Sequence, residues 1–175
     1  MEERLAVVAL VAALAAQGQV FLDEKKAADI VLRGCPAIER EEKAVTPEDR
    51  AQIEKISGLR VPIPRYTFLV CRNGEASRYA VIMDEIGKSE PITFLVGVES
   101  SGRVGEIALM VFRESRGWEV REPRFTRQFK GKKLEDPIRV NQDVMNYTGA
   151  TLSSEAMARG VKKALALVRH YYLEK

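Results

Sequence analysis

Apolar residues gather in the middle of the chain, in four runs separated by short polar turns. Asn73-Gly74 is a typical hairpin turn, and residues 100–103 form a second turn of small and polar residues. Connections this short cannot hold parallel crossovers, so the pattern predicts an antiparallel meander. The expected strands are 66–72, 77–86, 92–98 and 104–113, of which 92–98 is apolar enough to be covered on both faces.

Helical spacing flanks this predicted sheet. The clearest case is 154–173, where Met157, Val161 and Leu165 belong to one apolar stripe. Lys163 is expected on the opposite, polar side of that helix, together with Arg159, Lys162 and Arg169. The pattern therefore predicts an α+β fold, with an antiparallel β-sheet of about four strands, flanking helices and a long C-terminal helix. The other expected helices are 23–33, 46–57 and 123–130.

A short apolar run, residues 5–16, lies near the beginning of the chain and ends in small residues. It is shorter than the roughly 20 residues of a membrane span, and Ala13-Leu14-Ala15 fits a signal-peptidase site. The pattern favours export, with residues 1–16 as a signal peptide or an uncleaved N-terminal anchor. A buried N-terminal helix of a cytoplasmic protein is the alternative. Residues 17–175 are then expected to form a single domain.

The composition narrows the possible chemistry. The 175 residues include one His and two Cys, which is too few for a zinc site built on these ligands. Any chemistry is therefore expected to come from a cofactor, and no metal is expected. His170 is read as a partly exposed helix residue without partners. Cys35 and Cys71 could pair in an oxidising compartment, but sequence spacing leaves that open.

The charge balance gives little support to nucleic-acid binding. The formal net charge is +3, and the densest basic stretch, 124–133, interleaves two aromatic residues with cations. A short helix and loop with its aromatic residues in the core accounts for this stretch, so no nucleic-acid partner is expected. A basic loop beside a phosphate group is a further possibility.

Hydroxyl-bearing and small residues precede the final predicted helix. They include Thr148, Gly149, Ala150, Thr151 and Ser153. Backbone N–H groups at a helix start lack partners within the helix and carry its positive dipole end, which suits a phosphate. Gly149 and Ala150 allow the backbone to approach a ligand closely. Simple N-capping by a Ser or Thr side chain is the other interpretation.

The string Thr148-Gly149-Ala150-Thr151, followed by Ser153, resembles the motif of the FMN-binding domain family. Its best-known members are flavin-carrying subunits of the sodium-pumping NADH:quinone reductase and of the related Rnf electron-transfer complex. Segments 111–117 and 125–132 resemble two further family segments, and Asp143 stands for an acid expected before the motif. The resemblance covers 92 to about 167.

This resemblance implies FMN as the cofactor, attached by a phosphoester bond to Ser153, where the best-known members have Thr. The resemblance also implies that a flavin transferase outside the cytoplasm makes that bond. Glu114 and Ser115 could hydrogen-bond the ring or ribityl groups, and Lys130 and Lys132 could balance the phosphate charge. Candidates for the flat wall beside the isoalloxazine are Trp118, Phe125, Phe129 and Tyr147, for which core packing is the alternative.

We therefore expect an electron carrier at the periplasmic or extracytoplasmic face of the membrane, working with a redox partner protein or a membrane electron-transfer complex. An electron-transfer subunit is favoured over a stand-alone enzyme, because the redox chemistry belongs to the flavin and no residue needs to act as a general base. A flavin reductase or other flavin-dependent oxidoreductase with non-covalently bound FMN and a small substrate is the alternative. A binding module that has lost its FMN site is the third.

Overall fold

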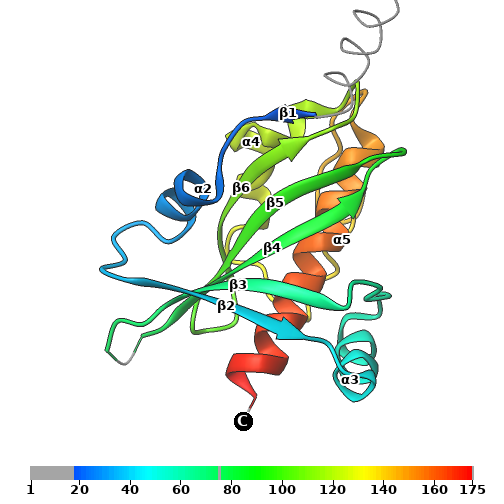
Figure 1. The fold of residues 1–175 in the computed structure, drawn as a ribbon. Helices are drawn as coiled ribbons and strands as arrows, with labels where there is room; N and C mark the ends of the chain where they lie inside the picture. Colours follow the sequence, from blue (N-terminus) through cyan, green and yellow to red (C-terminus); the bar gives the residue numbers. More distant parts are fainter. Residues whose placement is uncertain (1–17, 75, 175) are drawn as a thin grey trace, which may run out of the picture.

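The computed structural model describes residues 18–74 and 76–174, which form an antiparallel six-stranded sheet with helices on both faces (Figure 1). The strand order is β1-β6-β5-β4-β3-β2. The predicted four-stranded meander is confirmed as the centre of this sheet. Its strands are β3 (Arg65–Cys71), β4 (Arg78–Ile86), β5 (Pro91–Val98) and β6 (Val104–Phe112).

Two strands escaped the sequence analysis, so the sheet has six strands and not about four. Strand β1 (Gln19–Val20) has two residues and pairs with the end of β6. Strand β2 (Ile38–Ala44) pairs with β3 along its whole length and forms the opposite edge of the sheet. Its sequence is mostly charged, and its side chains are exposed or half-buried. An edge strand with little burial shows no alternation of apolar and polar residues.

The sheet separates two apolar cores. The larger lies between the sheet and α5 (Thr151–Val168), and the smaller lies under α2 (Glu24–Val31). Successive side chains of a strand point to opposite faces, so Phe94 of β5 enters the larger core and Leu95 enters the smaller one. Both side chains are fully buried, which confirms that this strand is covered on both faces.

The C-terminal helix confirms the clearest helical prediction, with two differences. Helix α5 begins at Thr151, three residues before the expected start, and continues into a π-helical turn, η3 (Arg169–Leu173). Lys163 was expected on an exposed polar face, and that was wrong. Its side chain is buried beneath α5, where its Nζ lies 2.6 Å from Oε1 of Glu85 on β4.

Helix α3 (Pro47–Ser57) lies near the C-terminal end of α5 and corrects the interpretation of His170. The Nε2 atom of His170 is 2.8 Å from Oδ1 of Asp49 on α3. The hydroxyl of Tyr171 also donates to Asp49. His170 therefore has a partner, which sequence alone could not reveal because the two lie 121 positions apart in the chain.

Two further expectations concerned the pairing of the cysteines and the nature of the N-terminal segment. Cys35 and Cys71 form a disulfide between the loop after α2 and the end of β3. The predicted signal or anchor, residues 1–16, lies outside the described residues. In the part of the chain that is described, no helix is long and apolar enough to cross a membrane.

The segment between β6 and α5 folds as short turns and not as one helix over 123–130. These are η1 (Trp118–Arg121), α4 (Pro123–Thr126) and η2 (Arg127–Phe129). The segment packs against β6 and brings the chain back to the start of α5.

Candidate functional site

A cavity of about 510 Å³ opens where the start of α5, the β4–β5 turn and the segment after β6 come together. Figure 1 shows the start of α5 and the β4–β5 turn at the same end of the molecule. Six of the predicted site residues line this cavity, joined by Lys88, Arg116 and Leu152. The six are Glu114, Ser115, Gly149, Ala150, Thr151 and Ser153.

The start of α5 offers backbone N–H groups to this cavity. The helix has Ala150 at its N-cap, with no capping side chain and no acidic residue in the first turn. Its first internal hydrogen bond runs from Ser154 N to Ala150 O, over 2.8 Å. In the described structure, no acceptor meets the N–H groups of Thr151, Leu152 or Ser153. The helix start therefore lacks the side-chain cap that the alternative interpretation assumed, and its positive dipole end is open to an anion.

Hydrogen bonds fix the loop that leads into this helix start. The side-chain amide of Gln128 accepts from Met145 N over 2.7 Å and donates to Met145 O over 3.3 Å. The side-chain amide of Asn146 donates to Thr151 Oγ1 over 2.8 Å. Gly149 has φ +83°, and a Cβ there would meet no atom within 4 Å. The backbone is therefore held in place while its glycine leaves open space on the ligand side.

Ser153 lies against Gly117, the residue before η1. Ser153 is only 4% exposed, and a Cβ on Gly117 would overlap the Ser153 hydroxyl. Gly117 also has φ +95°, which favours glycine by itself. Behind Ser153, the buried hydroxyl of Ser154 has no hydrogen-bond partner in the described structure. The space beside the Ser153 hydroxyl thus depends on the absence of a side chain at Gly117.

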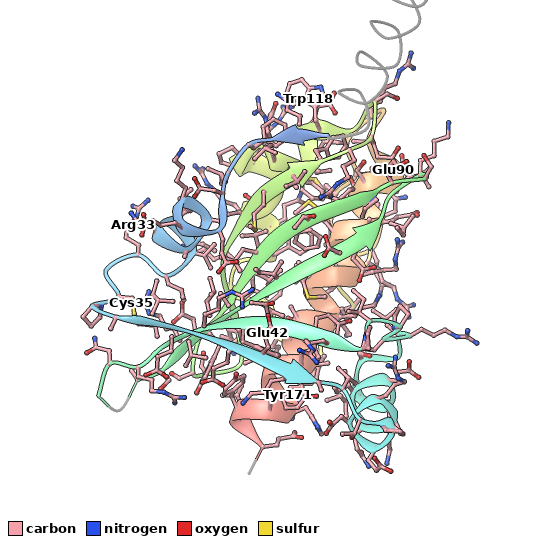
Figure 2. All side chains as sticks on the ribbon, in the orientation of Figure 1. Arg33, Cys35, Glu42, Glu90, Trp118 and Tyr171 are labelled. Atoms are coloured by element: carbon pink, nitrogen blue, oxygen red, sulfur yellow. A yellow bond between two sulfur atoms is a disulfide. The ribbon has the colours of Figure 1, made fainter. Side chains whose placement is uncertain are left out.

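Glu114 holds the β4–β5 turn against the cavity. Its Oε1 accepts from Ser89 N over 2.6 Å and from Glu90 N over 2.9 Å. Burial alone would raise the pKa of this carboxyl, but backbone N–H donors from Glu90, Ser89 and Lys88 outweigh burial and lower the pKa. Glu90 lies at the tip of the turn (Figure 2). Glu114 is thus an ionised side chain that positions the turn carrying Lys88.

The sequence analysis did not select two cations that line the cavity. Lys88 and Arg116 are both exposed, and neither forms an ion pair with any described residue. The topology could have revealed Lys88. Since β5 and β6 are antiparallel neighbours, the start of β5 must lie beside the end of β6, where Glu114 follows.

The structure does not bring two of the predicted basic residues to this cavity. Lys130 lines a different cavity and forms an ion pair with Glu106 of β6. The Lys132 ammonium lies 2.8 Å from Oδ2 of Asp143, whose carboxylate also accepts from the backbone of Ile138. Their charges are thus engaged away from the start of α5. Thr148 is exposed in the preceding loop and does not line the cavity.

The four aromatic candidates separate into core and surface residues. Phe125 and Phe129 are fully buried, as the alternative interpretation predicted. Tyr147 is half-buried and packs edge-on against Phe125, with ring centroids 5.8 Å apart. Trp118 is 40% exposed and follows Gly117 directly, but it does not line the cavity, and its ring centroid lies 4.8 Å from the guanidinium of Arg121.

The residues that line the cavity fall within a segment that matches a known protein domain. Residues 87–166 match the model of the FMN-binding domain. The match covers 80 of the 175 residues and indicates an FMN-binding domain in that part of the chain. The matched FMN-binding domain starts at the β4–β5 turn and ends within α5, so it contains every residue that lines the cavity. A search of curated proteins found no match to the chain.

The family indicates FMN as the cofactor, and the residues of the cavity fit it. Open N–H groups at the start of α5 suit the phosphate, and Lys88 and Arg116 supply positive charge beside it. Gly117 leaves room at the Ser153 hydroxyl.

Proposed function

We propose that this protein is an extracytoplasmic electron-transfer protein whose FMN is attached by a phosphoester bond at Ser153. One observation carries the proposal. The hydroxyl of Ser153 lies in the first turn of α5, where uncapped N–H groups and two unpaired cations line the same cavity.

The electrostatics of the cavity support an anion at this position. A helix start carries the equivalent of about half a positive charge, and no acidic side chain in the first turn of α5 opposes it. Lys88 and Arg116 add two positive charges on the other walls. Glu114 is the one carboxylate among the lining residues, and its Oε1 accepts hydrogen bonds from the backbone of the β4–β5 turn.

When bound, FMN supplies one- and two-electron redox chemistry that no side chain of the cavity can provide. The residues of the chain bind and orient it. The start of α5 would hold the phosphate, and Leu152 and Trp118 offer apolar surface, each being 40% exposed or more.

Two features support a location outside the cytoplasm. The Cys35–Cys71 disulfide is typical of an oxidising compartment. The apolar run 5–16 has the pattern of an export signal. The partners implied are a flavin transferase for attachment, and a redox partner protein or membrane electron-transfer complex for turnover.

The second candidate is a flavin reductase that holds FMN by contacts alone. The burial of Ser153 favours it, because a 4% exposed hydroxyl is less accessible to a flavin transferase than an open one. Ser153 also stands where the best-known family members have Thr. In this case the start of α5 would bind the phosphate without a covalent bond.

Co-expression with a flavin transferase separates the two candidates. Covalent attachment predicts a band that fluoresces after denaturing electrophoresis in the natural protein and in Ser154→Ala, but not in Ser153→Ala. Ser154 is the matched control because it is the neighbouring buried hydroxyl in the same helix turn. A colourless protein, or an equally bright band from Ser153→Ala, would overturn the proposal. Catalytic oxidation of NADH by the yellow protein alone would support the reductase instead.

A further inference from the structure

One edge of the sheet is left open along β6. Strand β1 pairs with β6 only at Val111 and Phe112. At the other end of the strand, Val104 exchanges backbone hydrogen bonds of 2.8 Å with the segment around Lys132. Between these contacts, in residues 105–109, no backbone hydrogen bond joins the outer edge of β6 to any other segment that the structure describes; the Glu106 side chain accepts from Lys130.

A groove follows this open edge. It has a volume of about 680 Å³, larger than the cavity at the start of α5, and residues 105–109 form one of its walls. Apolar side chains from both flanks line it, including Phe21 after β1 and Ile30 of α2. Figure 1 shows α2 and α4 on either side of β6. The groove therefore combines an unpaired strand edge with apolar walls.

The charge of the groove selects the kind of ligand. Five basic and two acidic side chains line it, which leaves an excess of three positive charges. Lys130 is already paired with Glu106. Arg33, which Figure 2 shows at the end of α2, and Arg127 form no ion pair within the described structure. These free cations favour an acidic ligand.

The open edge has few of the features that usually protect a strand edge. Residues 105–109 read Gly-Glu-Ile-Ala-Leu and include no Lys and no Pro. The opposite edge of the sheet, β2, is by contrast crowded with charged side chains. Five residues of strand offer about 17 Å of edge, enough to pair with a short extended peptide. The register of β6 on β5 shifts between Val104 and Ile107 and again between Leu109 and Val111.

We propose that the groove binds an extended, acidic segment of a partner protein, which adds to the sheet as a strand beside β6 between residues 105 and 109. Main-chain hydrogen bonds to β6 would supply affinity, and the basic rim would select acidic sequences. This binding does not require FMN to be attached at Ser153, so the two proposals can fail separately.

The groove is also connected to the FMN site. The guanidinium of Arg121 lies 4.5 Å from the ring centroid of Phe21 in the groove and 4.8 Å from that of Trp118. Trp118 in turn follows Gly117, which lies against Ser153. A partner segment in the groove would therefore lie on the side of the molecule where the flavin is expected.

The test uses the full chain and labelled synthetic peptides of about eight residues, a length that exceeds the open edge. A peptide of alternating Glu and Val is expected to bind, as measured by fluorescence anisotropy. Its counterpart of alternating Lys and Val is not. Methylating the backbone nitrogens of every second residue should abolish binding for one of the two alternate sets and leave it for the other, because only one edge of an added strand faces β6.

Two charge reversals locate the binding to the groove. Arg127→Glu is expected to weaken binding of the acidic peptide at least about tenfold, because it replaces an attraction with a repulsion. Arg60→Glu changes the net charge equally at an exposed position outside the groove, and should leave binding unchanged. Any one of four results would overturn the proposal. The two reversals could have equal effects, the Glu and Lys peptides could bind equally, both methylation sets could leave binding unchanged, or the acidic peptide could fail to bind.

Discussion

Glu85 of β4 and Lys163 of α5 form an ion pair in the interior, with Nζ 2.6 Å from Oε1 and both side chains less than 10% exposed. Arg159 lies on the outer side of the same carboxylate, 3.7 Å from Oε2. The pair joins the C-terminal helix to the sheet at a place where the rest of α5 packs through apolar residues.

Glu85→Gln is therefore expected to destabilise the protein by about 3 kcal/mol or more, because it leaves the Lys163 charge buried without a counter-charge. The double variant Glu85→Gln/Lys163→Met should regain much of that loss. Glu135→Gln is the matched control, because Glu135 pairs with Arg169 at the surface and is worth at most about 1 kcal/mol. Urea unfolding measures all three. A Glu85→Gln effect no larger than that of Glu135→Gln would contradict a structural role for the buried pair.

Gly117 is expected to be required for FMN binding because a side chain there would occupy the space of the Ser153 hydroxyl. Gly117→Ala should lose bound FMN, measured as flavin absorbance per protein after purification. Gly58→Ala is the control, because Gly58 has a similar positive φ of +70° but nothing within 4 Å of its Cβ position. Both variants carry a backbone strain of about 1 kcal/mol or more, so retention of FMN by both would show that the space at Gly117 is not needed.

The sequence analysis succeeded where burial leaves a pattern and failed where contacts join distant segments. The apolar run of β5 and the stripe beginning with Met157 reflect packing on the sheet, so both elements could be predicted. Strand β2 could not, because an exposed edge strand has no apolar face. Lys163 was misplaced because its partner, Glu85, lies 78 residues away.

In the candidate site too, the residues found from sequence are local ones, and those missed are brought together by contacts between distant segments. The motif residues 149–153 form one continuous loop and helix start, so local sequence was enough to select them. Lys88 and Gly117 were missed because they reach the cavity only through the pairing of the strands and the turn after β6. Lys130 was selected from local sequence as well, but the turns after β6 direct it to Glu106.

Reduction of the Cys35–Cys71 disulfide is expected to lower stability by about 4 kcal/mol, given the sequence separation of 36 between the two cysteines. The bond ties the loop after α2 to β3, away from the start of α5, so bound FMN should remain. Urea unfolding with and without dithiothreitol measures the loss. Cys35→Ala/Cys71→Ala should show no effect of the reductant, and an unchanged midpoint for the natural protein on reduction would contradict this account.

The stability of the protein is expected to depend on Asp49 in acid. The hydrogen bond with His170 is the main cause that lowers the pKa of Asp49 from 3.8 to about 2. Because the folded-state pKa lies below the unfolded one, this contribution is fully present above about pH 4 and is lost as the pH falls through about 2. His170→Gln removes the imidazole hydrogen bond that is the main cause of the lowered Asp49 pKa, so the stability of this variant should fall less steeply across that window. Parallel acid-unfolding curves for the two proteins would contradict this prediction.

Peptide mapping by mass spectrometry of the yellow protein, made together with a flavin transferase, tests the central claim most directly. The account predicts that the tryptic peptide containing Ser153 gains the mass of one FMN less one water, with fragments that place the gain on Ser153. The same peptide from Ser154→Ala should carry the gain, and that from Ser153→Ala should not. An FMN-containing protein in which this peptide has its unmodified mass, or carries the gain at Thr151, would contradict the claim that Ser153 is the attachment residue.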